Sequence, residues 1–336
     1  MATEPPRTPN SEDHFNLAVR LESIFMPHLR RLRDAAYGKS AVAGQARFAH
    51  YTSAEAALKI IRSKRVWMRN VTCMTDYREV QHGNTILRKF FNRENILAFS
   101  TALDSSVPGA AREGFALFDQ WWNDIQFSSY IFSVSEHDNT EDSHGRLSMW
   151  RAFGGAAARV AMVIRIPWFS QPALALNLTF SPVAYLNEEQ VHKELEKVIE
   201  NIRQNAEFLA SVDRSTVVNW VFSFLITGVT CLKHEGFHEE REWRGIYAPK
   251  RTPSPLVDHS VEVIGGIPQL VYKLPIDATN QPALQGLDLS SIFDRLIIGP
   301  SPYPWSMYEA FREVLTEAKV PSADTRIFVS GIPIRV

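Results

Sequence analysis

Two glutamates stand two positions apart in the segment Glu240-Arg241-Glu242-Trp243-Arg244. In an extended chain alternate side chains share a face, so Glu240 and Glu242 are expected together, with Arg241 and Trp243 on the other face. Paired carboxylates can act as general acid and base, or stabilise a positive charge that develops in a transition state. An edge strand carrying solvated charges is the alternative for this segment taken alone.

A second pattern, His234-Glu235-Gly236-Phe237-His238, matches H-E-x-x-H, in which two histidines one helical turn apart hold zinc. A zinc metallopeptidase is therefore an alternative function. The required helix is disfavoured, because a central glycine costs about 1 kcal/mol of helix stability. Positions 241 and 244, where a further ligand would stand, are both arginine. We therefore expect no metal site.

The sequence also lacks the glycine-rich phosphate loops and the G-x-S-x-G elbow, which disfavours kinases, Rossmann dehydrogenases and α/β-hydrolases.

A third group of polar side chains lies in the early segment Arg47–Ser53 (RFAHYTS). We predict a strand over Arg47–Thr52, with His50 and Thr52 on one face, leading into a helix through the capping box Thr52-x-x-Glu55.

Together these segments resemble a large, mostly uncharacterised bacterial family with a predicted ADP-ribosyltransferase fold. The resemblance runs from Phe48 to the C-terminus and rests on five motifs in order. They are His50-Tyr51-Thr52-Ser53; Met74-Thr75-Asp76-Tyr77-Arg78-Glu79, with Thr75 where the family usually has Asn; Ser133-Val134-Ser135 with Ser148-Met149-Trp150-Arg151; Glu240–Arg244; and Ser330-Gly331-Ile332-Pro333-Ile334-Arg335.

The resemblance implies an NAD-dependent ADP-ribosyltransferase, a glycosyltransferase that breaks the bond between nicotinamide and ribose through an oxocarbenium-like state. Glu242 is the expected catalytic acid, with Glu240 orienting the acceptor and His50 acting in both catalysis and binding. The other residues expected to bind NAD, which is the substrate, are Tyr51, Thr52, Ser135, Trp150 as an aromatic wall, and Asp76, with Glu79 beside the cleft. We expect His50 and Glu242 on neighbouring strands that face one cleft.

The biological role and the acceptor stay open at this level. The resemblance implies a toxin, an effector or a phage-defence enzyme, with an antitoxin or immunity protein as a possible partner. A protein side chain, a nucleic acid base and water are all open as acceptors, and transfer to water would make the chain an NAD glycohydrolase. A non-catalytic module that binds a nucleotide or a partner is the alternative from another class.

The remaining pattern indicates an α+β fold, with an antiparallel or mixed sheet and surrounding helices. We expect a disordered segment over 1–13 and one domain over 14–336 with a helical insertion at about 188–232. Helices are expected over Phe15–Arg33 with a break at Pro27, Val191–Leu209, Val217–Leu232 and Trp305–Ala318. Strands are expected to outnumber the helices, and a polar loop is expected over Asn70–Gly83. Further strands are predicted at Val66–Met68, Ile96–Phe99, Ser129–Ser135, Val160–Ile166, Leu178–Tyr185, Trp243–Tyr247, Val261–Val263, Leu270–Leu274, Arg295–Ile298 and Thr325–Val329.

The composition restricts the surroundings in which these elements work. The 336 residues are 45% hydrophobic and 22% charged with a net charge of −1, so no overall field draws the chain to nucleic acid or to anionic lipid. Two cysteines form no disulfide framework, which favours the reducing cytoplasm. The Pro-rich N-terminus is no signal peptide. The 16-residue apolar run Val217–Leu232 is shorter than the roughly 20 residues that span a bilayer, so no membrane is expected.

Overall fold

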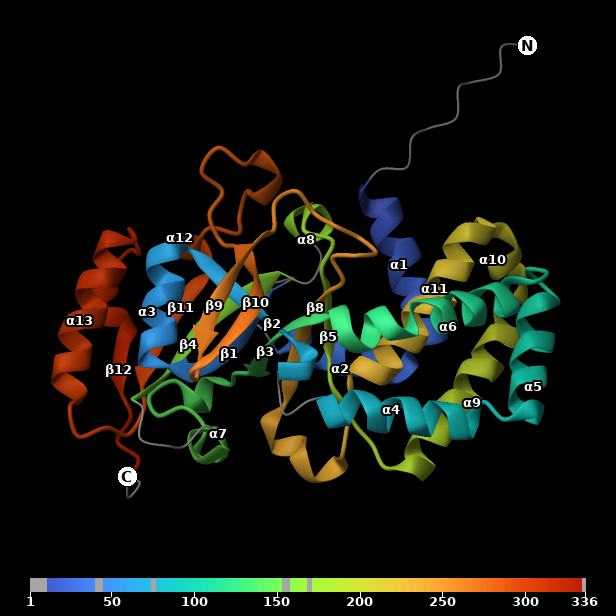
Figure 1. Cartoon of the computed structure of the whole chain (residues 1–336), viewed down its shortest axis with the longest axis horizontal. Coiled ribbons are helices and arrows are strands. Elements are labelled where there is room, and N and C mark those ends of the chain that lie inside the picture. The colour runs from blue at the N-terminus through green and yellow to red at the C-terminus, as the bar shows by residue number, and fades with distance from the viewer. Residues whose placement is uncertain (1–10, 40–44, 74–76, 153–157, 168–170, 334–336) are drawn as a thin grey trace, which may run out of the picture.

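The computed structural model describes residues 11–39, 45–73, 77–152, 158–167 and 171–333 (Figure 1). Its centre is a mixed β-sheet in which the order of strands is β12-β11-β4-β1-β3-β2-β10-β9, with β8 between β3 and β5. The strands of this sheet are β1 (Gln45–Ser53), β2 (Arg65–Asn70), β3 (Tyr130–Glu136), β4 (Arg159–Pro167), β5 (Thr179–Pro182), β8 (Glu242–Tyr247), β9 (Asp258–Ile264), β10 (Ile267–Pro275), β11 (Phe293–Ile298) and β12 (Ile327–Val329). A separate parallel pair is formed by β6 (Ala184–Tyr185) and β7 (Leu232–Lys233).

Helices gather at one end of the molecule, on the right in Figure 1. This helical layer is drawn from three parts of the chain and encloses a large apolar core. Its members are α1 (Ser11–Phe25), α2 (Pro27–Gly38), α4 (Tyr77–Phe90), α5 (Arg93–Asp104), α6 (Ala110–Ser128), α9 (Glu188–Gln204), α10 (Ala206–Ser211) and α11 (Arg214–Thr230). The helical insertion predicted at about 188–232 is therefore only one part of a larger layer.

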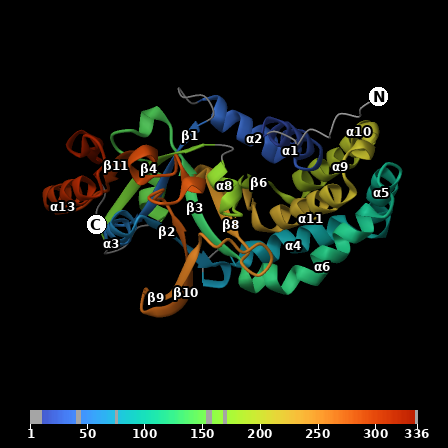
Figure 2. The same ribbon diagram turned by 90° about the horizontal axis from the view of Figure 1, so that it is seen from above.

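A second core lies at the opposite end of the sheet. There α3 (Ala54–Ser63), α12 (Leu289–Ile292) and α13 (Pro304–Glu317) pack with β4, β11 and β12. Two further short helices are α7 (Leu147–Ala152) and α8 (Gln171–Ala175). The hairpin β9–β10 projects from the sheet between the two ends (Figure 2). A further core lies against the centre of the sheet and includes buried side chains of β1, β2, β3 and β8.

The sheet divides around β3, which has different neighbours along one of its edges. On one side β8 pairs with β3 from Tyr130 to Ser135. On the other side β2 pairs only with Tyr130 and Ile131, and β1 pairs only with Ser135 and Glu136. Beyond Ala49, β1 continues along β4 and leaves β3. Strand pairing alone thus opens a gap beside residues 132–134.

Most of the predicted elements are confirmed by the described residues. The early helix breaks at Pro27 as expected, and the strands predicted at Val66–Met68, Ser129–Ser135, Val160–Ile166, Trp243–Tyr247 and beyond correspond to β2, β3, β4 and β8 to β12. The strand predicted at Leu178–Tyr185 is divided into β5 and β6. Most of the run Val217–Leu232 lies in the buried helix α11, which ends at Thr230, and Leu232 begins β7. No helix in the described ranges is long and apolar enough to cross a membrane.

Other expectations are wrong. Ile96–Phe99 lies inside α5, and the second half of the predicted loop over 70–83 is the start of α4. The described strands therefore do not outnumber the described helices. The cap of α3 is one residue later than predicted, because Ser53 rather than Thr52 accepts the backbone N–H of Ala56. Helix α1 begins at Ser11, so 11–13 is not disordered, and residues 1–10 lie outside the described part.

A close approach in the centre of the sheet explains a glycine in β8. A Cβ built on Gly245 would lie 1.9 Å from the ring of Phe132, which is buried and stacks against Phe180. We expect Gly245→Ala to lower the free energy of unfolding by on the order of 3 kcal/mol, measured by urea denaturation, because the ring has no free space to move into. Gly38→Ala is the matched control, since nothing lies within 4 Å of its added Cβ. Equal stability of the two variants would contradict this packing.

Candidate active site

A cavity of about 530 Å³ opens where β1 separates from β3. It is lined by His50, Tyr51 and Thr52 from β1, by Ser133 and Ser135 from β3, and by the acid pair. The charged side chains that line it are Glu55, Lys59, Arg69, Arg159, Lys233, Glu240 and Glu242. This volume is within the range of small-molecule sites. The first and fourth motifs of the sequence therefore meet at one cavity.

His50 is held by the gap itself. Because β1 leaves β3 after Ala49, the Ser133 carbonyl has no partner from β1, and His50 Nδ1 lies 2.9 Å from it. A carbonyl only accepts, so Nδ1 carries the proton and Nε2 of the neutral ring is an acceptor. Burial lowers the pKa of His50, although the bond to Ser133 partly opposes it. His50 is therefore neutral at physiological pH and can accept a hydrogen bond from a hydroxyl group.

Glu242 lines the same cavity, but its strand is not a neighbour of β1 as predicted. It stands on β8, and β3 lies between it and β1, so the prediction of neighbouring strands is wrong. Strand alternation places His50 and Glu242 on opposite faces of a continuous sheet. The sheet is not continuous here, and both side chains border the gap.

The Glu242 carboxylate is buried and bound by two cations. Arg244 Nε and Nη2 lie 2.9 and 3.1 Å from its two oxygens, and Lys233 Nζ lies 3.4 Å from Oε2. Burial alone would raise the pKa of Glu242, but Arg244 and then Lys233 outweigh it and hold the pKa well below its usual range. The acid is therefore ionised, and any ligand hydroxyl must share it with Arg244.

Glu240 is the more accessible of the two acids. It ends the 3₁₀ helix Glu235–Glu240, and Arg241 follows in the left-handed conformation at φ 43°, so the two acids do not lie on one extended strand as predicted. Lys233 Nζ nevertheless joins them, at 2.7 Å from Glu240 Oε2. The side chain of Glu240 is 25% exposed against 9% for Glu242, and burial raises its pKa despite the bond from Lys233.

A third carboxylate completes this cluster from the helical layer. Glu79, in the first turn of α4, lies 3.1 Å from Lys233 and 2.6 Å from Arg244. Burial lowers the pKa of the Lys233 ammonium, but Glu242, Glu79 and Glu240 together raise it above its usual value. Glu79 is thus on a helix rather than a loop, and it supports the acids from behind. The neighbouring candidate Asp76 lies outside the described residues.

Ser135 and Tyr51 hold the loop that carries Glu240. The Ser135 hydroxyl donates to the Glu240 carbonyl and accepts a bond of 2.6 Å from Arg146 Nη1. The Tyr51 hydroxyl accepts the Arg146 backbone N–H at 2.8 Å, and burial raises its pKa to about 12. Both residues line the cavity, but their hydroxyls are already bound within the protein. Thr52 lines the cavity beside them.

Trp150 belongs to the core rather than to the cavity wall. Only 4% of it is exposed, its indole N–H donates to the His144 carbonyl at 2.7 Å, and its ring meets Tyr51 edge to face at 4.9 Å. The residues of this helix that line the cavity are Met149 and Ala152. An aromatic wall for nicotinamide is therefore not formed by Trp150.

The H-E-x-x-H match does not form the helix that a zinc peptidase needs. His234 precedes the 3₁₀ helix, and its Nδ1 accepts the Gly236 N–H at 3.1 Å. His238 Nδ1 donates to the Glu235 carbonyl at 3.0 Å. Among the described residues, no group of three or more His, Cys, Asp or Glu side chains is placed to hold a metal ion.

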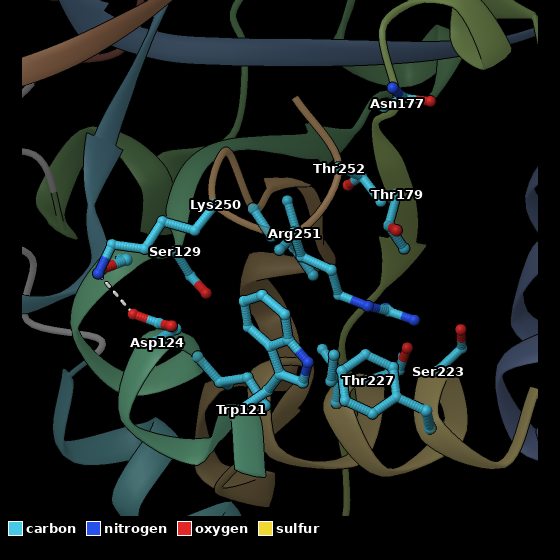
Figure 3. Close-up of a pocket in the computed structure, with 16 residues that line it drawn as sticks. Trp121, Asp124, Ser129, Asn177, Thr179, Ser223, Thr227, Lys250, Arg251 and Thr252 are labelled. Atoms are coloured by element: carbon cyan, nitrogen blue, oxygen red, sulfur yellow. Dashed lines mark hydrogen bonds and ion pairs between the residues drawn. The ribbon is translucent and has the colours of Figure 1, made fainter. Parts of the chain in front are cut away.

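A smaller hollow of about 70 Å³ lies between α6, α11 and the loop after β8 (Figure 3). Lys250 pairs with Asp124 at 2.6 Å on its rim. The Arg251 guanidinium stacks 3.6 Å from the centre of the Phe222 ring, and Nη2 donates to Asn219. These groups are occupied within the protein and the space is too small for a dinucleotide, so the larger cavity is the better candidate.

Sequence reasoning missed three side chains that line the larger cavity, and also Arg244, which is buried behind Glu242. Arg244 was part of a recognised motif, and its period-two spacing from Glu242 was a usable signal for a shared face. Lys233 reaches the acids only because β7 lies beside them, and Trp67 and Arg159 come from strands with no distinctive motif. No local pattern could have identified the last three.

Comparison with known families gives one partial match. A family described as Protein of unknown function (DUF2971) matches residues 149–245, which include the Met149-Trp150 pair and the Glu240–Arg244 segment. The chain matches no curated protein and no solved structure.

Proposed function

We propose that the chain is an NAD-dependent ADP-ribosyltransferase whose reaction takes place in the cavity beside β3. One observation carries the proposal: the gap in the sheet brings His50, Tyr51 and Thr52 to the same 530 Å³ cavity as Glu240 and Glu242. A hydroxyl-binding edge opposite paired carboxylates is the arrangement that cleavage through an oxocarbenium-like state requires.

The proposed reaction assigns each side chain a separate task. The bond between ribose C1′ and nicotinamide breaks, and the pyridinium nitrogen takes the electron pair and leaves as neutral nicotinamide. Glu242, held ionised by Arg244 and Lys233, stabilises the positive charge on the ribose. His50 Nε2 accepts a hydrogen bond from a ribose hydroxyl. The acceptor, oriented by Glu240, then attacks C1′, and the proton that it loses passes to solvent water.

The test is nicotinamide release by the purified protein. We expect release from NAD and transfer of label from adenylate-labelled NAD to a macromolecule in a cell lysate, both above the level of the Glu242→Gln variant. If neither product exceeds that level, the proposal fails.

Glu240→Gln is expected to separate transfer from hydrolysis. Glu240 ends the 3₁₀ helix at the cavity and has the more exposed carboxylate, so its loss should reduce transfer by about tenfold or more. Nicotinamide release should fall less than about threefold, because water still captures the cation. Glu239→Gln is the matched control, since Glu239 is exposed on the same 3₁₀ helix outside the cavity lining. A variant that loses hydrolysis but retains transfer would contradict this assignment.

A binding module without turnover is the second candidate, and one observation favours it. Both oxygens of Glu242 accept hydrogen bonds from Arg244, which neutralises much of the charge that catalysis would use. Tight binding of NAD without nicotinamide release, in wild type and Glu242→Gln alike, would select this function.

A further inference from the structure

Two buried donors on the cavity wall have no partner within the protein. Arg159 Nε and Trp67 Nε1 are both inaccessible to solvent, and neither meets an acceptor in the described part of the chain. Both residues line the cavity. Buried N–H groups are nearly always paired, because an unpaired one loses its hydrogen bonds to water without replacement. Two such groups on one cavity point to a ligand that supplies acceptors.

The charge of Arg159 makes the inference more specific. Arg159 forms no ion pair with any described carboxylate, whereas Lys233, on the same cavity, contacts three. Lys59, which also lines the cavity, lies with its ammonium 5.5 Å from the centre of the Trp67 ring. A guanidinium fork with free donors is suited to two oxygens of one phosphate group.

Arg159 stands away from the acids along the cavity. Arg159 on β4 pairs with Ser53 at the end of β1. Glu242 on β8 pairs with Ser135 on β3, which in turn pairs with Ala49 on β1. Ala49 and Ser53 are four residues apart along β1, a span of about 13 Å. An elongated ligand can therefore place a sugar at the acids and a charged group near Arg159.

We propose that Arg159 and the Trp67 indole bind the diphosphate of a nucleotide in this cavity. The inference rests on the proposed function for the orientation of the ligand, with ribose toward Glu242. It does not depend on turnover, because a nucleotide diphosphate that the protein never cleaves would satisfy the same donors.

The test is calorimetric binding of ADP-ribose and of adenosine to the full chain. We expect wild type to bind ADP-ribose, and Arg159→Gln to weaken this binding about 10- to 100-fold while changing adenosine binding less than about threefold. Trp67→Phe, which keeps the ring and removes the donor, should weaken ADP-ribose binding about 3- to 10-fold. The affinity of wild type should also fall more steeply with salt than that of Arg159→Gln.

Arg62→Gln is the matched control, because Arg62 is exposed on α3 outside the cavity lining. The inference would be overturned if wild type does not bind ADP-ribose, or if wild type and Arg159→Gln bind it with equal affinity. Water would then be the partner of the buried donors. If Arg159→Gln is too unstable to measure, unchanged affinity in Trp67→Phe would overturn it. Absence of nicotinamide release, with ADP-ribose binding that depends on Arg159, would instead reject the transferase proposal and leave the diphosphate site.

Discussion

Glu242→Gln is expected to reduce nicotinamide release and ADP-ribosyl transfer together by about 10²–10³-fold, the usual loss when one electrostatic stabiliser is removed. Glutamine keeps the size of the side chain and removes its charge at the point where the ribose becomes positive. Release is measured by chromatography of nicotinamide, and transfer by incorporation of label. Both must fall, because the charged state precedes capture by either water or a macromolecule.

The variant must be separated from a loss of folding, because Glu242 is only 7% exposed and pairs with the fully buried Arg244. Glu79→Gln is the control that the structure provides. It removes a carboxylate from the same two cations, but Glu79 is not among the residues that line the cavity. Equal loss of activity and of stability in the two variants would show that the acids are structural. Loss of activity in Glu242→Gln alone would support catalysis.

Arg244→Met is expected to have the largest effect on stability, a loss of about 3–5 kcal/mol at neutral pH. The guanidinium is fully buried, and it donates to Glu242, to Glu79 and to the Thr230 carbonyl at 2.6 Å. Its removal leaves two carboxylates with Lys233 as their remaining shared cation. Urea denaturation of wild type and variant measures the difference, and a loss below about 1 kcal/mol would contradict a stabilising role for this cluster.

The difference in the free energy of unfolding between wild type and Arg244→Met should become smaller in acid. In wild type the folded-state pKa of Glu242 is lower than its ordinary value of 4.5. Its ionised form therefore adds to the free energy of unfolding above pH 4.5, and this contribution is lost as the pH falls through the folded-state pKa. In the variant, burial without Arg244 raises that pKa, and the carboxylate protonates at a higher pH. The two stabilities should therefore approach each other below pH 4.5, provided both remain folded. A constant difference across this range would assign the effect to packing instead.

The sequence was most informative where local patterns decide the structure. Pro27 divides the first helices as predicted, and the strands predicted at Ser129–Ser135 and Val160–Ile166 correspond to β3 and β4. It failed at Ile96–Phe99, because four apolar residues suit either a strand or a helix. In α5 only one helical face is buried in the helical core, through Phe99, Ala102 and Leu103. Residues 235–240 were beyond such reasoning, since Arg146 and Ser135, about a hundred positions away, fix that turn.

The candidate site divides in the same way. His50 and Glu242 carried recognisable motifs, and both line the cavity. Their relative placement could not be read from strand alternation, because the register of β1, β3 and β8 is a property of the whole sheet. Trp150 also carried a motif, but the glycines at 145 and 299 pack against its ring and keep it in the core.

The origin of the gap beside β3 bears on how such a chain can change its activity over evolutionary time. The opening results from the strand order, with β1 and β2 each pairing with a different end of β3, and not from an inserted loop. A sequence that preserves this register keeps the separation of the strands, and its side chains decide the size and shape of the hollow. The framework and the chemistry can therefore diverge independently: substitutions on the lining alter ligand preference, while the strands that create the space are held by a central core that includes Phe48, Met68 and Trp243.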